Sequence, residues 1–132
     1  MHTNICLSGY VIEIIASVKE LIDSHPLEWK TTDQLAADAV INHKLLQKGF
    51  RLMYEINISE YQLQRRMDAA SEMLEQGRFS KKQIAKRCGY NSYSNFSIAF
   101  KRTHKISPSD WQNRHAVSHR NLLYNHIARH AS

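Results

Sequence analysis

Two stretches of the chain place polar and basic side chains opposite an apolar stripe at helical spacing. In residues 92–103 the apolar positions are Phe96, Ala99 and Phe100. The opposite face carries Tyr93, Ser94, Asn95, Ser97, Lys101 and Arg102. In residues 43–54 the polar positions are His43, Lys44, Gln47, Lys48 and Arg51. Such faces supply hydrogen bonds and positive charge, a chemistry suited to a polyanion.

Arrangements typical of enzymes and metal sites do not stand out. There is no glycine-rich phosphate loop, no pair of carboxylates in an apolar setting and no nucleophile–base arrangement above chance. Cys6 and Cys88 lack metal-ligand spacing, and Cys88 falls on an apolar stripe, which favours a buried thiol. His115 and His119 lie four residues apart, but neither a cysteine nor a carboxylate is near them in sequence. We therefore expect no enzyme, no cofactor and no metal.

The polar face of residues 92–103 needs a preceding helix and a turn to present it. Ser80 is a suitable N-cap, with Gln83 three residues later as its capping-box partner. Gly89 suits the left-handed backbone that ends a helix. A short helix, a glycine turn and a polar, basic second helix form a helix-turn-helix candidate.

The same pattern occurs earlier in the chain, which indicates an internal repeat. Thr31 and Gln34 form a second capping-box pattern, followed by a short helix, a turn at residues 40–42 and the helix over residues 43–54. Shifted by 49 residues, Gln34 falls on Gln83, and shifted by 50, Phe50 falls on Phe100. One additional residue in the second turn accounts for the change of shift.

The pattern predicts an all-α fold of about seven helices, with two homeodomain-like helix-turn-helix subdomains joined by a long linker helix. Residues 1–57 hold the first subdomain and an earlier helix from Ser8 or Gly9 to about Ser24. Residues 58–77 form the linker helix, with Ser59 as its cap and Gly77 as its end. Residues 78–114 form the second subdomain, and residues 115–132 a basic, histidine-containing tail that suits a last helix.

Charge and length limit the function classes. The chain has 132 residues, of which 42% are hydrophobic, and a net charge of +6. Residues 80–132 carry ten basic and one acidic residue, and residues 1–40 two basic and six acidic. No apolar run approaches the ~20 residues that cross a bilayer, and the start lacks a signal-peptide pattern. We expect a cytoplasmic protein with no membrane contact.

Three motifs of the second unit resemble a known family. The segments IAKRCGY (residues 84–90) and ISPSDW (residues 106–111), with Phe96, Phe100, Lys101 and Arg102 between them, resemble the second helix-turn-helix of the AraC/XylS transcription regulators. The resemblance covers residues 11–114. It departs from the family at five positions. Family members usually have glycine where this chain has Val40, Glu55 and Lys105, proline where it has Ile58, and a larger apolar residue where it has Gly49.

The resemblance implies sequence-specific binding to double-stranded DNA, with the helices at about 43–54 and 92–103 in adjacent major grooves. A linker of about 27 Å suits successive major-groove faces that recur at about 34 Å. The implied base-reading residues are Lys44, Gln47, Lys48, Ser94, Asn95 and Ile98. The implied phosphate or flanking residues are His43, Arg51, Tyr93, Ser97, Lys101 and Arg102.

The resemblance also implies a small stand-alone regulator of the MarA/SoxS type, which binds DNA as a monomer and has RNA polymerase as a candidate partner. Two alternatives stay open. The chain fits a DNA-binding fragment of a longer sensor-regulator, and its basic face also fits a helical protein-interaction module or adaptor. The sequence does not separate them.

Overall fold

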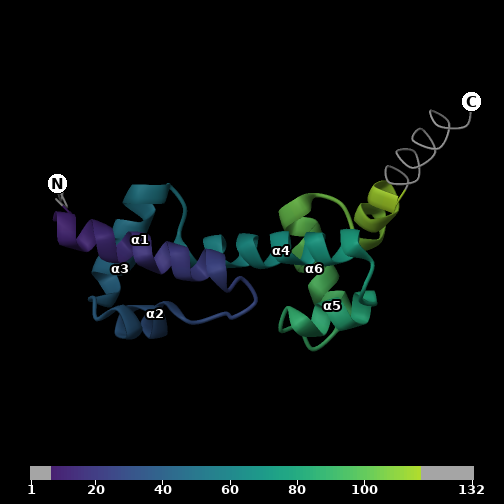
Figure 1. Cartoon of the computed structure of the whole chain (residues 1–132), viewed down its shortest axis with the longest axis horizontal. Helices are drawn as coiled ribbons and strands as arrows, with labels where there is room; N and C mark the ends of the chain where they lie inside the picture. Colours follow the sequence, from purple (N-terminus) through teal and green to yellow (C-terminus); the bar gives the residue numbers. More distant parts are fainter. Residues whose placement is uncertain (1–6, 117–132) are drawn as a thin grey trace, which may run out of the picture. The chain divides into compact units, whose positions relative to one another are not determined.

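The computed structural model describes residues 7–116 and is built of helices alone over that range (Figure 1). The labelled helices are α1 (Gly9–Ser24), α2 (Thr32–Ala39), α3 (His43–Tyr54), α4 (Ile58–Gln76), α5 (Lys81–Arg87) and α6 (Tyr93–His104). A seventh helical segment begins at residue 108 and continues to residue 116, where the described part ends. The predicted all-α class is confirmed. Of the tail predicted over residues 115–132, residues 117–132, including His119, lie outside the described residues.

The chain divides into two compact units, Met1–Arg66 and Met67–Ser132. The division falls inside α4, so this helix contributes residues to both units. Each unit contains one short helix followed by one longer helix, α2 with α3 and α5 with α6. The two helix pairs match the internal repeat of the sequence.

The first unit packs α1, α2 and α3 around one apolar core. Its buried members come from all three helices and from the start of α4: Ile15, Val18, Ile22, Leu35, Ala36, Leu46, Phe50 and Ile58. Gly49 of α3 is also buried, and a Cβ atom there would collide with the side chain of Ile15. The glycine thus lets α1 approach α3 closely, which explains why no larger residue occupies this position.

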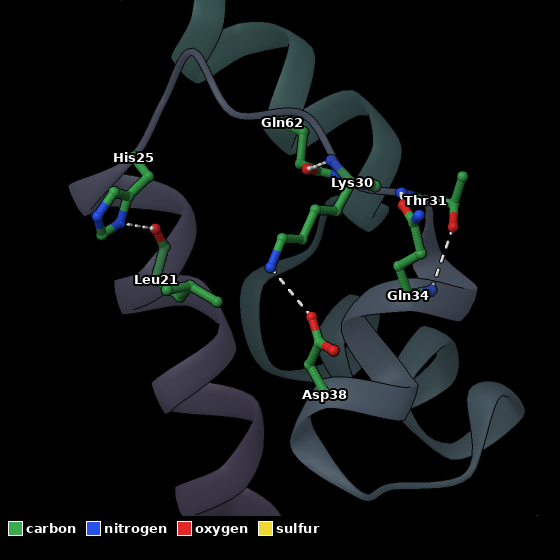
Figure 2. A network of polar contacts seen from close by, with 7 residues as sticks. All are labelled: Leu21, His25, Lys30, Thr31, Gln34, Asp38 and Gln62. Carbon is green, nitrogen blue, oxygen red and sulfur yellow. Dashed lines mark hydrogen bonds and ion pairs between the residues drawn. The ribbon is translucent and has the colours of Figure 1, made fainter.

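A buried glutamine fixes the loop between α1 and α2 (Figure 2). Gln62 of α4 is only 4% exposed. Its Nε2 donates to the carbonyl of Lys30 at 2.8 Å, and its Oε1 accepts from the Lys30 backbone N–H at 3.3 Å. The Lys30 side chain extends the network to α2, where its ammonium lies 3.0 Å from the Asp38 carboxylate. The neighbouring Thr31–Gln34 capping box, present as predicted, starts α2. The loop therefore enters α2 in a defined geometry.

A second polar cluster ties α1 to α4 within the first unit. The Asp23 carboxylate accepts a hydrogen bond from the Tyr61 hydroxyl and lies 3.1 Å from both Lys19 Nζ and Arg65 Nε. Lys19 and Asp23 are both half-buried in this cluster, although charged side chains opposite the apolar stripe of a helix usually face solvent. The reason is that long side chains from α4 cover this side of α1.

The second unit has an aromatic core. Phe96 and Phe100 of α6 are fully buried with ring centroids 5.8 Å apart, and the ring of Trp111 lies 5.8 Å from that of Phe100. His104 approaches the carbonyl of Met67 at 3.0 Å, and Gln112 donates to the carbonyl of Leu74 at 3.2 Å. The C-terminal half of α4 is thus joined to α6 and to the segment after it.

One predicted cap was wrong. The linker helix α4 begins at Ile58, the predicted first residue, but the cap is Asn57 and not Ser59, because the side chain of Asn57 accepts from the backbone N–H of Glu60 at 2.9 Å. Asn57 is the better cap because the side chain of Ile58 must face the core, where it is 2% exposed.

Candidate nucleic-acid interface

The first recognition-helix candidate, α3, is fixed by its cap and by one buried face. The side chain of Asn42 accepts from the backbone N–H groups of Lys44 and Leu45 at 2.9 and 3.2 Å. Leu46 and Phe50 are fully buried, and the Phe50 ring packs against Tyr54 and Tyr61 at centroid distances of 4.8 and 5.5 Å. These contacts fix the rotation of α3 about its own axis.

That rotation leaves the predicted polar residues of α3 on the surface. Lys44, Gln47, Lys48 and Arg51 are all exposed and recur at steps of three or four residues, so they share one helix face. His43 is half-buried at the first turn, where its Nδ1 lies beside the Asp33 carboxylate of α2. The structure therefore brings four of the five predicted side chains together, and His43 faces α2.

The second candidate, α6, is built in the same way. Ser92 caps it by accepting from the backbone N–H of Asn95 at 3.2 Å, and Phe96 and Phe100 anchor its inner face. The exposed face carries the remaining polar and basic positions together with one isoleucine: Ser94, Asn95, Ile98, Lys101 and Arg102. Tyr93 and Ser97 are half-buried at the edges of this face. Exposure is required for contact with DNA, and the contact of each side chain remains a prediction.

Three residues at the ends of these elements have left-handed backbones. Val40 has φ 54°, Glu55 φ 59° and Lys105 φ 72°, and each follows the last residue of a helix. They are the three positions at which the family resemblance leads one to expect glycine. Val40 occupies in the first turn the place of Gly89, φ 86°, in the second. The two turns therefore have a left-handed residue at the same aligned position despite their different sequences and lengths.

Two basic residues of α5 were not among the predicted site residues. Lys82 and Lys86 line a surface pocket of about 400 Å³ together with the turn that leads into α6. The sequence signal was present, because the two lysines lie four residues apart on a predicted helix. The family resemblance does not indicate these lysines, because its implied contact residues lie in the second helix of each unit.

Two features are absent from residues 7–116, a metal-ligand group and a membrane-spanning helix. No group of three or more histidine, cysteine or acidic side chains could hold a metal ion in this range. A search of the same residues finds no helix that could cross a membrane.

Comparison with known proteins identifies the fold. A family model described as a helix-turn-helix domain matches residues 35–114. The transcriptional regulator GadX of Escherichia coli is 32% identical over 89 residues, which is 67% of this chain and 32% of GadX. This chain spans roughly a third of the length of the curated relatives that it matches.

Two solved structures share the architecture. A regulator from Chromobacterium violaceum, described as of the type that contains an AraC-type DNA-binding domain, superposes with a TM-score of 0.73 at 23% identity, covering 83% of this chain and 97% of that one. The DNA-binding domain of AdpA, solved with a target DNA, gives a TM-score of 0.72 at 23% identity and covers 79% and 94%. With the family match over both helix pairs, the chain belongs to the AraC-type helix-turn-helix family of transcription regulators.

Proposed function

We propose that the chain binds double-stranded DNA sequence-specifically and regulates transcription, with α3 and α6 in adjacent major grooves. The observation that carries the proposal is the duplicated unit: each copy has a short helix, a left-handed turn and a second helix with one buried and one exposed polar face. The AdpA domain with its target DNA supports the proposal, because that protein has the same fold.

The two exposed faces offer different base-reading chemistry. Lysine donates to guanine O6 and N7, and glutamine or asparagine pairs with adenine through two hydrogen bonds. In α3 these groups are Lys44, Gln47 and Lys48. In α6 the exposed hydrogen-bonding groups are the amide of Asn95 and the hydroxyl of Ser94. The exposed Ile98 offers only an apolar contact with a thymine methyl. We therefore assign more of the base discrimination to α3.

Phosphate contacts supply affinity and register in this proposal. Arg51, Lys101 and Arg102 lie toward the C-terminal ends of the exposed faces, where long cationic side chains reach the DNA backbone. Neutralising phosphates releases condensed counterions, so affinity should fall steeply with salt.

Selection of bound duplexes from a random library, followed by gel shift at several salt concentrations, tests the proposal. The selected duplex should outcompete random DNA at moderate salt. Gln47→Ala and Asn95→Ala should weaken this preference more than they weaken binding to random DNA. Equal binding to every duplex at low salt that disappears at moderate salt would contradict sequence-specific reading and favour the interaction-module alternative.

The assembly state forms part of the same proposal. We propose that one chain binds an asymmetric site in the cytoplasm, with RNA polymerase as its further partner. Sedimentation of the complex should give one chain per selected duplex. A complex with two chains on a palindromic duplex would contradict the monomeric proposal and leave the DNA-binding proposal intact.

A further inference from the structure

The two units differ in the charge of their short helices, α2 and α5. When the chain is aligned on itself with the 49-residue shift, Asp33 of α2 falls on Lys82 of α5, and Asp38 falls on Arg87. Both aligned pairs reverse their charge. The short helix α2 is therefore acidic and the short helix α5 basic, although both begin with a capping box.

Internal contacts account for the acidic groups and for half of the basic groups. Asp33 lies beside His43, and Asp38 pairs with Lys30. In α5 the ammonium of Lys81 donates to Ser109 at 2.9 Å, and the guanidinium of Arg87 lies 3.9 Å from the centre of the Phe79 ring. Lys81 and Arg87 thus have structural partners in the second unit.

Lys82 and Lys86 have no such role. Both are exposed, and within residues 7–116 no ion pair involves either ammonium group. They lie four residues apart on one helix, an arrangement that repels when no anion lies nearby. Two uncompensated positive charges therefore face the same region of solvent.

That region is the surface pocket of about 400 Å³. Lys82, Ala85 and Lys86 form its α5 side, and Tyr90, Asn91, Ser92 and Tyr93 form the side that leads into α6. The pocket thus adds the first turn of α6, which carries the positive end of the helix dipole, and hydrogen-bonding side chains to the two ammonium groups. Together these groups match a phosphodiester.

We propose that this pocket binds one backbone phosphate of the DNA beside the groove entered by α6, and that the first unit has no equivalent subsite. The proposal rests on the proposed function. In the first unit the carboxylate of Asp33 takes the aligned place of Lys82 and repels a phosphate. The second unit accordingly contributes more of the electrostatic affinity for DNA, and the affinity of the first unit depends more on base contacts.

The salt dependence of binding tests the subsite. The full chain, the double variant Lys82→Gln/Lys86→Gln and a charge-matched control, Arg78→Gln/Arg114→Gln, are titrated with the selected duplex between 50 and 200 mM salt. Arg78 and Arg114 are exposed and do not line the pocket. The lysine variant should bind about tenfold more weakly than the control, with a slope of log K against log salt smaller by about one.

A duplex series with single neutral methylphosphonates locates the contact. At one phosphate, neutralisation should weaken the wild-type chain and leave the lysine variant unaffected, as a thermodynamic cycle requires for two groups in contact. Lysine and control variants with equal affinity and slope, or no phosphate with this behaviour, would overturn the subsite while specific binding by the wild-type chain stands. A wild-type chain that does not bind DNA would refute the proposed function and the subsite together.

Discussion

The turn between α2 and α3 requires a left-handed backbone at Val40. This residue has a left-handed backbone and is 88% exposed, so its side chain contributes little packing to offset the strain. A left-handed conformation costs an L-residue about 1–2 kcal/mol, whereas glycine adopts it freely at the cost of about 0.5–1 kcal/mol of chain entropy. The turn between α2 and α3 therefore does not depend on the valine side chain.

Val40→Gly should stabilise the first unit by about 0.5–1 kcal/mol, because relief of strain exceeds the entropy cost. Hydrogen exchange of core amides in α3, such as that of Phe50, measures the change in this unit alone. The matched control is Ala37→Gly, at an exposed position of α2, which should destabilise by about 1 kcal/mol. Equal losses from both variants would show that Val40 is not strained.

Features that depend on short-range spacing are predictable from the sequence. The capping boxes at Thr31 and Ser80, the buried Phe96 and Phe100, and the exposed recognition faces follow from short-range spacing. Gly49 does not, because its reason is the side chain of Ile15, 34 positions earlier in the sequence. Long-range contacts of this kind carry no signal in the local pattern of either residue.

At the scale of elements, Gln62 joins α4 to the loop before α2 (Figure 2). Gln62→Leu should destabilise the first unit by about 1–3 kcal/mol, because the backbone groups of Lys30 lose their partners in a partly buried place. Denaturant unfolding of the variant gives the change in free energy. Gln64→Leu, at an exposed position of the same helix, is the control and should change stability little. Similar losses in the two variants would refute the role of Gln62.

The Asp23 cluster makes the stability of the first unit depend on pH. Burial of the carboxyl group raises the pKa of Asp23, but hydrogen bonds from Tyr61 and Lys19 and the charges of Lys19 and Arg65 lower it, and the net pKa is below its ordinary value of 3.8. Because the folded pKa is lowered, the cluster stabilises the fold above that ordinary value. The contribution is lost as pH falls through the lower folded pKa.

Asp23→Asn should therefore reduce stability at pH 7, with the difference from the wild type shrinking below about pH 4. Denaturant unfolding at pH 7, 5, 4 and 3 measures the difference. Glu13→Gln is a suitable control, because Glu13 is exposed on the same helix and makes no ion pair within residues 7–116. A difference between Asp23→Asn and the wild type that stays constant down to pH 3 would contradict the lowered pKa.

For the whole molecule, the sequence predicted the fold and the internal repeat better than the difference in charge between the two helix-turn-helix units. The repeat, the helix bounds and the family match agree because all depend on apolar spacing and caps. The charges of α2 and α5 do not follow from apolar spacing or caps. The contrast between Asp33 and Lys82 can be interpreted only from the structure, which shows the pocket beside α6. The structure therefore adds an asymmetry that the recognition helices alone do not reveal.

In the proposed complex both units read DNA, each in its own half of one site. The most direct test compares the base preferences of the wild type, Gln47→Ala and Asn95→Ala at every position of the selected duplex. Each variant should lose about 1–3 kcal/mol of discrimination at positions confined to one half, and the two halves should differ. If both variants keep the wild-type preferences, or lose them in the same half, the account of two reading helices is wrong.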